Sequence, residues 1–214
     1  MIIAAAVCPH PPALVPEVGL GLPEMEPTRA AAAEAIEAML GERPDRVVVI
    51  GPRTNSVDAD ESAGGSFAGF GVVLTAGGDD LRLPAAYTVG AWLLDRAGWT
   101  GPRRYTSSWP EPGAADALLV LADSDTAVGV SAPTHGDPRA AAVDDVVAEA
   151  LARGDAEALA ALDVDLAEEW DGTGVAPLRL LGEMTKGARI TARLRSDEAP
   201  FGVRYWVADW RLAR

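Results

Sequence analysis

Ile2-Ile3-Ala4-Ala5-Ala6-Val7 is a short apolar run near the start of the chain, and Cys8-Pro9-His10-Pro11-Pro12 follows it directly. An apolar run that is closed by a proline predicts a buried β-strand. Residues 29–40 are rich in Ala, Glu and Leu or Met and are followed by Gly41, which predicts a helix. The β-branched run Val47-Val48-Val49-Ile50 predicts a second buried strand. A strand, a helix and a strand in this order imply a parallel sheet with a right-handed crossover.

The rest of the chain continues the same α/β pattern. Residues 117–122 predict a third buried strand, whereas residues 57–65 predict a surface loop and residues 70–75 a weak strand. Two alternating segments near the C-terminus predict an antiparallel pair joined by a seven-residue loop; these are residues 188–194 and 202–209. Further helices are predicted over residues 83–97, 138–153, 155–170 and 176–184. We therefore expect one domain over residues 1–214, with a mostly parallel central sheet, flanking helices and a C-terminal antiparallel hairpin.

The amino-acid composition argues against several classes of function. The chain has 214 residues, of which 49% are hydrophobic and 23% charged, enough apolar material for a core. It carries 32 acidic and 18 basic residues and a formal net charge of -14, which argues against binding to nucleic acid or to anionic membranes. Cys8 is the single cysteine, and the first residues lack the basic region of a signal peptide. We expect a cytoplasmic protein.

Polar residues follow each of the three strongest predicted strands. In open α/β sheets, ligands bind beyond the carboxyl ends of the strands. If the three strands are parallel neighbours, their ends line one cleft. The alternative is that strand ends are polar simply because they reach solvent. The candidate ligand-binding residues at these ends are Cys8, His10, Arg53, Asn55, Asp123, Ser124 and Asp125.

His10 is the first candidate catalytic residue, because the flanking prolines restrict the backbone and so help to orient its imidazole. The alternative role is to cap or anchor the loop. Cys8 and His10 are two residues apart, so in an extended segment they face the same side. They would then form a thiolate–imidazole pair or two metal ligands. The alternative for Cys8 is a small apolar residue at the end of a buried strand.

His135 is the other histidine of the chain and the second candidate catalytic residue. It precedes a predicted helix that starts with Asp137 as N-cap and Pro138 at the first position. Either it folds over the cleft as a lid or a general acid/base, or it is an exposed loop residue. The chain has no Gly-x-Ser-x-Gly motif and no Walker-type Gly-Lys-Ser/Thr motif, so neither a nucleophile elbow nor a P-loop is predicted.

Five stretches of the chain carry short motifs: residues 2–18, the predicted helix 29–40 with 44–52, residues 67–72, residues 83–94 and residues 174–178. These stretches resemble the LigB-type proteins, the catalytic-subunit superfamily of class III extradiol ring-cleavage dioxygenases. The resemblance implies a single α/β domain. It also implies a mononuclear non-heme iron(II), held by two histidines and a carboxylate, that binds a catechol and dioxygen, with a further histidine as acid/base.

Only part of this family's iron site has matching residues in the chain. His10 matches the first iron ligand, but Arg53 stands where the second ligand histidine is expected. A guanidinium has no lone pair to donate to a metal. The acid/base histidine is expected near Asp123-Ser124-Asp125, where the chain has none. Two histidines cannot fill three roles, so we expect a degenerate active site.

We therefore predict a LigB-like, metal-poor relative that binds a small molecule, anionic or phenolic, through Arg53 and Asn55. No resident cofactor is expected; the alternative is Fe(II) or Zn held weakly at His10 with Asp123 or Asp125. Arg53 has an alternative role as a structural ion-pair partner of Asp123 or Asp125. Two alternative functions stay open: an active extradiol dioxygenase, which is an oxidoreductase, and an interaction subunit of a larger assembly. A homo-oligomer is a further alternative.

Overall fold

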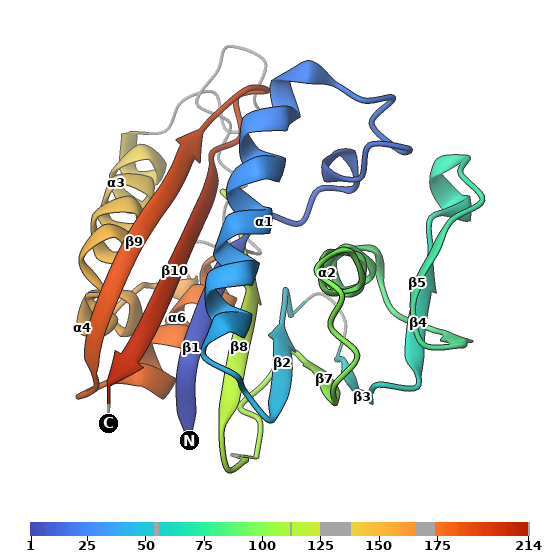
Figure 1. The fold of residues 1–214 in the computed structure, drawn as a ribbon. Helices are drawn as coiled ribbons and strands as arrows, with labels where there is room; N and C mark the ends of the chain where they lie inside the picture. The colour runs from blue at the N-terminus through green and yellow to red at the C-terminus, as the bar shows by residue number, and fades with distance from the viewer. Residues whose placement is uncertain (54–55, 112, 125–137, 166–173, 214) are drawn as a thin grey trace.

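A seven-stranded sheet forms the centre of the computed structural model, which describes residues 1–53, 56–111, 113–124, 138–165 and 174–213 (Figure 1). Its parallel part is a row of four neighbouring strands, and antiparallel strands flank that row on both sides. The strands, in their order across the sheet, are β3 (Asp58–Asp60), β7 (Arg103–Thr106), β2 (Arg46–Ile50), β8 (Asp116–Leu121), β1 (Ile2–Cys8), β10 (Tyr205–Ala213) and β9 (Arg189–Glu198). The expected mostly parallel sheet is confirmed.

The three strands predicted from apolar runs, β1, β2 and β8, are direct neighbours. β8 lies between the other two and pairs with both in parallel, so that Leu118 is opposite Val48 on one side and Ala5 on the other. All three strands are buried on both faces. Continuous apolar runs are what strands need when helices cover both faces of a parallel sheet.

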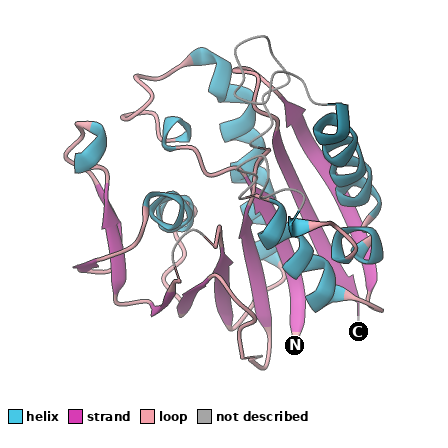
Figure 2. Ribbon diagram, turned by 180° about the vertical axis from the view of Figure 1, so that it is seen from behind, coloured by secondary structure: helices cyan, strands magenta, loops and turns pink. Residues whose placement is uncertain are grey.

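Helices cover both faces of the sheet (Figures 1 and 2). α1 (Glu26–Gly41) and α2 (Ala85–Arg96) pack on one face. α3 (Pro138–Arg153), α4 (Ala156–Ala160) and α6 (Val175–Thr185) pack on the other. Because neighbouring residues on a strand point to opposite faces, β1 contributes Ala4, Ala6 and Cys8 to the first layer and Ala5 and Val7 to the second. Two short 3-10 helices, η1 (Pro12–Leu14) and η2 (Pro23–Met25), lie between β1 and α1.

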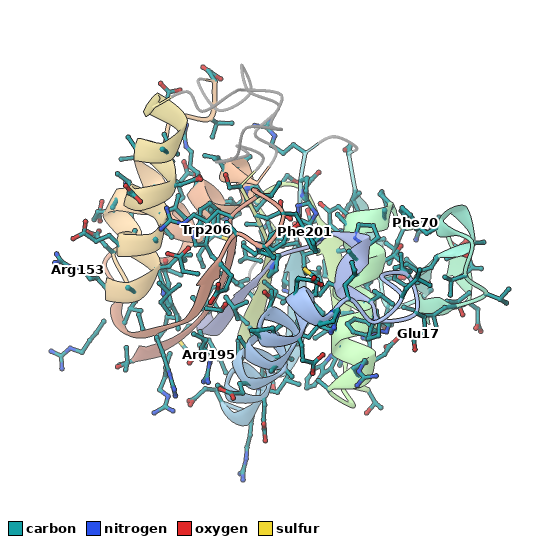
Figure 3. All side chains as sticks on the ribbon, turned by 90° about the horizontal axis from the view of Figure 1, so that it is seen from above. Glu17, Phe70, Arg153, Arg195, Phe201 and Trp206 are labelled. Carbon is teal, nitrogen blue, oxygen red and sulfur yellow. The ribbon has the colours of Figure 1, made fainter. Side chains whose placement is uncertain are left out.

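The C-terminal antiparallel hairpin is confirmed, but its strands are longer than expected. β9 runs through Arg195 to Glu198, because a bulge at Arg195 keeps the strand paired: Leu194 is opposite Ala208 and Ser196 is opposite Val207. Viewed from above, Arg195 lies on the α1 side of the sheet and Trp206 on the α3 side (Figure 3).

Two predictions in the middle of the chain are wrong. Residues 57–65 were expected to form a loop, but they contain β3 and most of β4 (Ala63–Ser66). The expected strand over residues 70–75 is instead the end of η3 (Ala68–Phe70) and a turn that leads to β5 (Thr75–Gly77). β4 pairs with β5 and with β6 (Asp80–Leu81) in a separate small sheet. Gly65 allows this sheet to pack on α2, because a Cβ there would lie 1.9 Å from Thr88 Oγ1.

None of the helices in the described ranges is long and apolar enough to cross a membrane.

Candidate functional site

His10 and Asp123 come together where two neighbouring strands end. β1 and β8 are parallel, and their pairing continues past the strands, since the Ala122 N–H donates to the Cys8 carbonyl at 3.0 Å. His10 lies two residues after Cys8, and Asp123 follows Ala122 directly. His10 Nε2 lies 3.2 Å from Asp123 Oδ1, and the His10 backbone N–H points to Oδ2 at 3.4 Å. The predicted meeting of these strand ends is thus present for this pair.

The pair is largely shielded from water. The His10 side chain is 15% exposed and the Asp123 side chain 5%. The two facing atoms are at ion-pair distance but are not aligned as a hydrogen bond. At this separation they attract each other when the imidazole is protonated. They are also close enough to bind one cation together, because metal–ligand bonds of about 2.0–2.2 Å allow two ligand atoms about 3 Å apart.

Ser124 ties this edge of the sheet to α3. Its hydroxyl donates to Asp144 Oδ2 at 2.9 Å, and its backbone N–H donates to the Arg204 carbonyl at 2.9 Å. Asp144 is buried, and the Arg204 guanidinium nearby is held by Asp197 and Asp145. These carboxylates raise the pKa of Arg204, so its charge is permanent. The Ser124 hydroxyl therefore has a structural partner, whereas the sequence suggested a ligand-binding role.

Sequence reasoning missed two residues of this region, Asp144 and Gly174. Asp144 lies on the buried face of α3 together with Val147 and Leu151, a spacing that is visible in the sequence. Gly174 immediately precedes α6 and contacts the backbone of Asp123. A glycine two residues before the predicted helix 176–184 was the available signal for such a close approach.

Cys8 lies in the apolar layer beneath α1 and α2 and is fully buried. Burial raises the pKa of its thiol to about 12, because the thiolate would lose its hydration. The thiol is therefore protonated at neutral pH. This environment favours the packing role of Cys8 over the thiolate–imidazole pair with His10.

Arg53 follows β2, the other neighbour of β8, and its side chain is exposed. Within the described ranges it forms no ion pair, so the structural pairing with Asp123 is not found. Asn55, Asp125 and His135 lie outside the described residues, and so does a pairing of Arg53 with Asp125.

The iron centre implied by the resemblance needs two histidines and a carboxylate. Among the residues that the structure describes, no three His, Cys, Asp or Glu side chains are grouped as metal ligands. His10 and Asp123 supply one imidazole and one carboxylate, and a guanidinium stands at the expected position of the second histidine. This donor set does not fit that centre.

Comparison with known proteins does not assign the chain to a family. No family model matches the chain, and no curated protein matches it either.

Proposed function

We propose that the chain is a LigB-like protein that binds a small phenolic or anionic molecule at the carboxyl edge of its sheet, without the iron centre of the ring-cleaving enzymes. One observation carries the proposal. The imidazole nitrogen of His10 faces the carboxylate of Asp123 at 3.2 Å, across two neighbouring parallel strands. The short motifs shared with LigB-type proteins and the α/β architecture support it.

The chemistry of this edge suits a phenol. A phenolic O–H donates a hydrogen bond to a carboxylate or to a neutral imidazole, and both groups are present in a site from which water is largely excluded. Arg53 follows the neighbouring strand and has no carboxylate partner within the described ranges. It supplies a cation for a ligand that also carries a carboxylate.

The second candidate is a weak metal site with the same two residues as ligands. The 3.2 Å separation of His10 Nε2 and Asp123 Oδ1 favours it, because both atoms then reach one Fe(II) or Zn. Further ligands would have to come from elsewhere in the chain, and an active dioxygenase requires them. An interaction subunit of a larger assembly has no such supporting contact.

The proposal includes a cellular location and excludes one class of partner. A lone buried thiol suits a reducing compartment, so we infer a cytoplasmic location. The excess of acidic residues argues against nucleic acid as a partner.

Isothermal titration with protocatechuate, a catechol that carries a carboxylate, tests the proposal. We expect binding to the wild type and about tenfold weaker binding to His10→Ala, which removes a hydrogen-bonding group from a shielded site. Arg53→Ala weakens binding by about fivefold, because an exposed charge contributes less. Arg189→Ala is the matched control, since Arg189 is also exposed and unpaired within the described ranges but lies on β9. Binding that is absent, or that is unchanged in both site variants, would disprove the proposal.

A further inference from the structure

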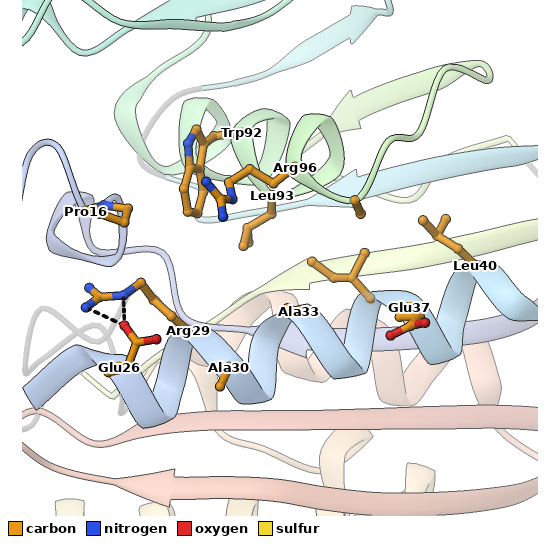
Figure 4. A pocket seen from close by; sticks show the side chains of 12 residues that line it. Pro16, Glu26, Arg29, Ala30, Ala33, Glu37, Leu40, Trp92, Leu93 and Arg96 are labelled. Carbon is orange, nitrogen blue, oxygen red and sulfur yellow. Dashed lines mark hydrogen bonds and ion pairs between the residues drawn. The ribbon is translucent and has the colours of Figure 1, made fainter. Parts of the chain in front are cut away.

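A cleft of about 590 Å³ lies between α1 and α2, on the face of the sheet that these helices cover (Figure 4). Its size is in the range of about 300–1,000 Å³ that is usual for small-molecule sites. Neither His10 nor Asp123 is among the residues that line it, so it is separate from the carboxyl-edge pair.

The walls of the cleft combine apolar and charged side chains. α1 presents the small side chains of Ala30 and Ala33 and, further along, Leu40, while α2 presents Leu93 and the indole of Trp92. Sites for small ligands use apolar side chains to pack against the ligand and polar groups to orient it. Trp92 is 8% exposed, and an aromatic ring can pack against the part of the indole that lines the cleft.

One end of the cleft carries two guanidinium groups. The Arg96 guanidinium lies over the Trp92 ring, 5.4 Å from its centroid, and has no carboxylate partner within the described ranges, whereas most of the arginines there have one. Arg29, from α1, is bound to Glu26 at 3.0 Å and to the Leu22 carbonyl at 2.8 Å.

Glu26 balances the charge of Arg29, but the hydrogen-bonding capacity of the guanidinium is only partly used. Its Nη1 atom is buried and has no hydrogen-bond partner in the part of the chain that the structure describes. Because that atom is enclosed and Glu26 balances Arg29, the positive charge at this end of the cleft comes from Arg96. Glu37 lies beside Leu40, at the end of the cleft away from Arg29 and Trp92 (Figure 4). The cleft is therefore positive at one end and negative at the other.

We propose that this cleft binds a small aromatic carboxylate. The carboxylate accepts hydrogen bonds from Arg96, whose planar guanidinium matches it in geometry. The ring lies between Trp92 and the alanines of α1. Charge complementarity selects an anion at this end, because Glu26 is already bound to Arg29 and Glu37 is remote.

Isothermal titration with naphthalene carboxylate, and with naphthalenemethanol as its uncharged counterpart, tests the charge recognition. We expect the carboxylate to bind at or below about 1 mM, the weak end of small-ligand affinity. The alcohol, and the carboxylate with Arg96→Gln, bind about tenfold more weakly, because a charge-assisted hydrogen bond is lost. No binding of the carboxylate, or equal binding of the alcohol, would overturn the proposal.

A second pair of variants tests the location. Ala33 and Ala142 are both exposed alanines on helices, but only Ala33 lines the cleft. Ala33→Phe fills the cleft and abolishes binding, whereas Ala142→Phe, the same change on α3, leaves it intact. His10→Ala also leaves it intact, which separates this cleft from the carboxyl edge. Binding that survives Ala33→Phe, or that is lost in His10→Ala, places the ligand elsewhere and refutes the inference.

Discussion

Gly174 is in such close contact with Asp123 that a Cβ atom at position 174 would lie 1.9 Å from the Asp123 carbonyl oxygen. The backbone of Gly174 is helical, so the glycine is not required for an unusual conformation. It is required for space. The residue that precedes α6 and the residue that faces His10 are thus held against each other by main-chain contact.

Gly174→Ala is expected to lower the free energy of unfolding by about 2–3 kcal/mol, because the added methyl group forces a backbone shift. Urea denaturation measures the loss. Gly41→Ala is the matched control: it adds the same methyl group within a helix, where nothing lies within 4 Å. The control is expected to be neutral or to stabilise by up to about 1 kcal/mol. Equal losses in the two variants would contradict the role of the Asp123 contact.

The ion pair of Arg46 and Asp116 ties β2 to β8. Arg46 Nε and Nη2 donate to the two carboxylate oxygens of Asp116 at 3.0 and 2.9 Å, and the Asp116 side chain is 1% exposed. Asp116→Asn is expected to cost about 3 kcal/mol of stability, at the low end for breaking a buried pair because Arg46 is partly exposed. Thermal denaturation provides the measurement. Glu149→Gln, which removes the exposed pair with Arg153, is expected to cost less than about 0.5 kcal/mol.

The raised pKa of the buried Cys8 thiol predicts a loss of stability at alkaline pH. Its pKa is raised from 9.0 to about 12 in the folded protein, so its contribution to stability is complete below pH 9 and is lost as the pH rises toward 12. Over this window the wild type should lose up to about 1.4 kcal/mol per pH unit more than Cys8→Ala, as measured by urea denaturation between pH 9 and about pH 11.

Thiol labelling provides an independent check of the same burial. Cys8 should react with Ellman's reagent only after unfolding. Rapid labelling of the native protein would argue against the buried thiol. So would a free energy of unfolding that changes with pH in the same way in the wild type and in Cys8→Ala.

Metal removal separates the two candidate functions. If the carboxyl edge works without a metal, dialysis against EDTA leaves both the melting temperature and protocatechuate binding unchanged. Elemental analysis of the undialysed protein should then find iron and zinc well below one equivalent. Stoichiometric iron or zinc that is lost in His10→Ala, together with oxygen uptake on catechol, would favour the metal-bound alternative.

The elements that the sequence predicts are those whose apolar residues follow a regular pattern, either a continuous run or a helical repeat. β1, β2 and β8 are apolar on both faces and are recognised as strands. β7 is not, because Arg103 and Arg104 give it a polar sequence; only the fold shows that Arg103 is neutralised by Asp95 at 2.7 Å. On α3, the helical spacing of Ala142, Val146 and Ala150 would place them on one apolar stripe, yet Val146 is 47% exposed. Asp144 is buried instead, because Ser124 offers it a hydrogen bond.

The candidate site is predictable to a similar extent. The meeting of His10 and Asp123 follows from the parallel pairing of the strands that precede them, and both strands are visible in the sequence. The structural partner of Ser124 does not follow, because it depends on how α3 crosses the sheet. Cys8 and His10 were expected to face the same side, but Pro9 ends the strand between them, so alternation does not extend to His10.

The position of β1 between β8 and β10 has a consequence for biosynthesis. β1 is the first of these strands to leave the ribosome, yet both neighbours are encoded in the second half of the chain. The nascent polypeptide therefore carries an apolar segment with two open hydrogen-bonding edges until β8 has been made, and with one open edge until β10 has been made. Such distant pairing slows folding and exposes the segment to other nascent chains. Yield on refolding should therefore fall steeply as the protein concentration rises.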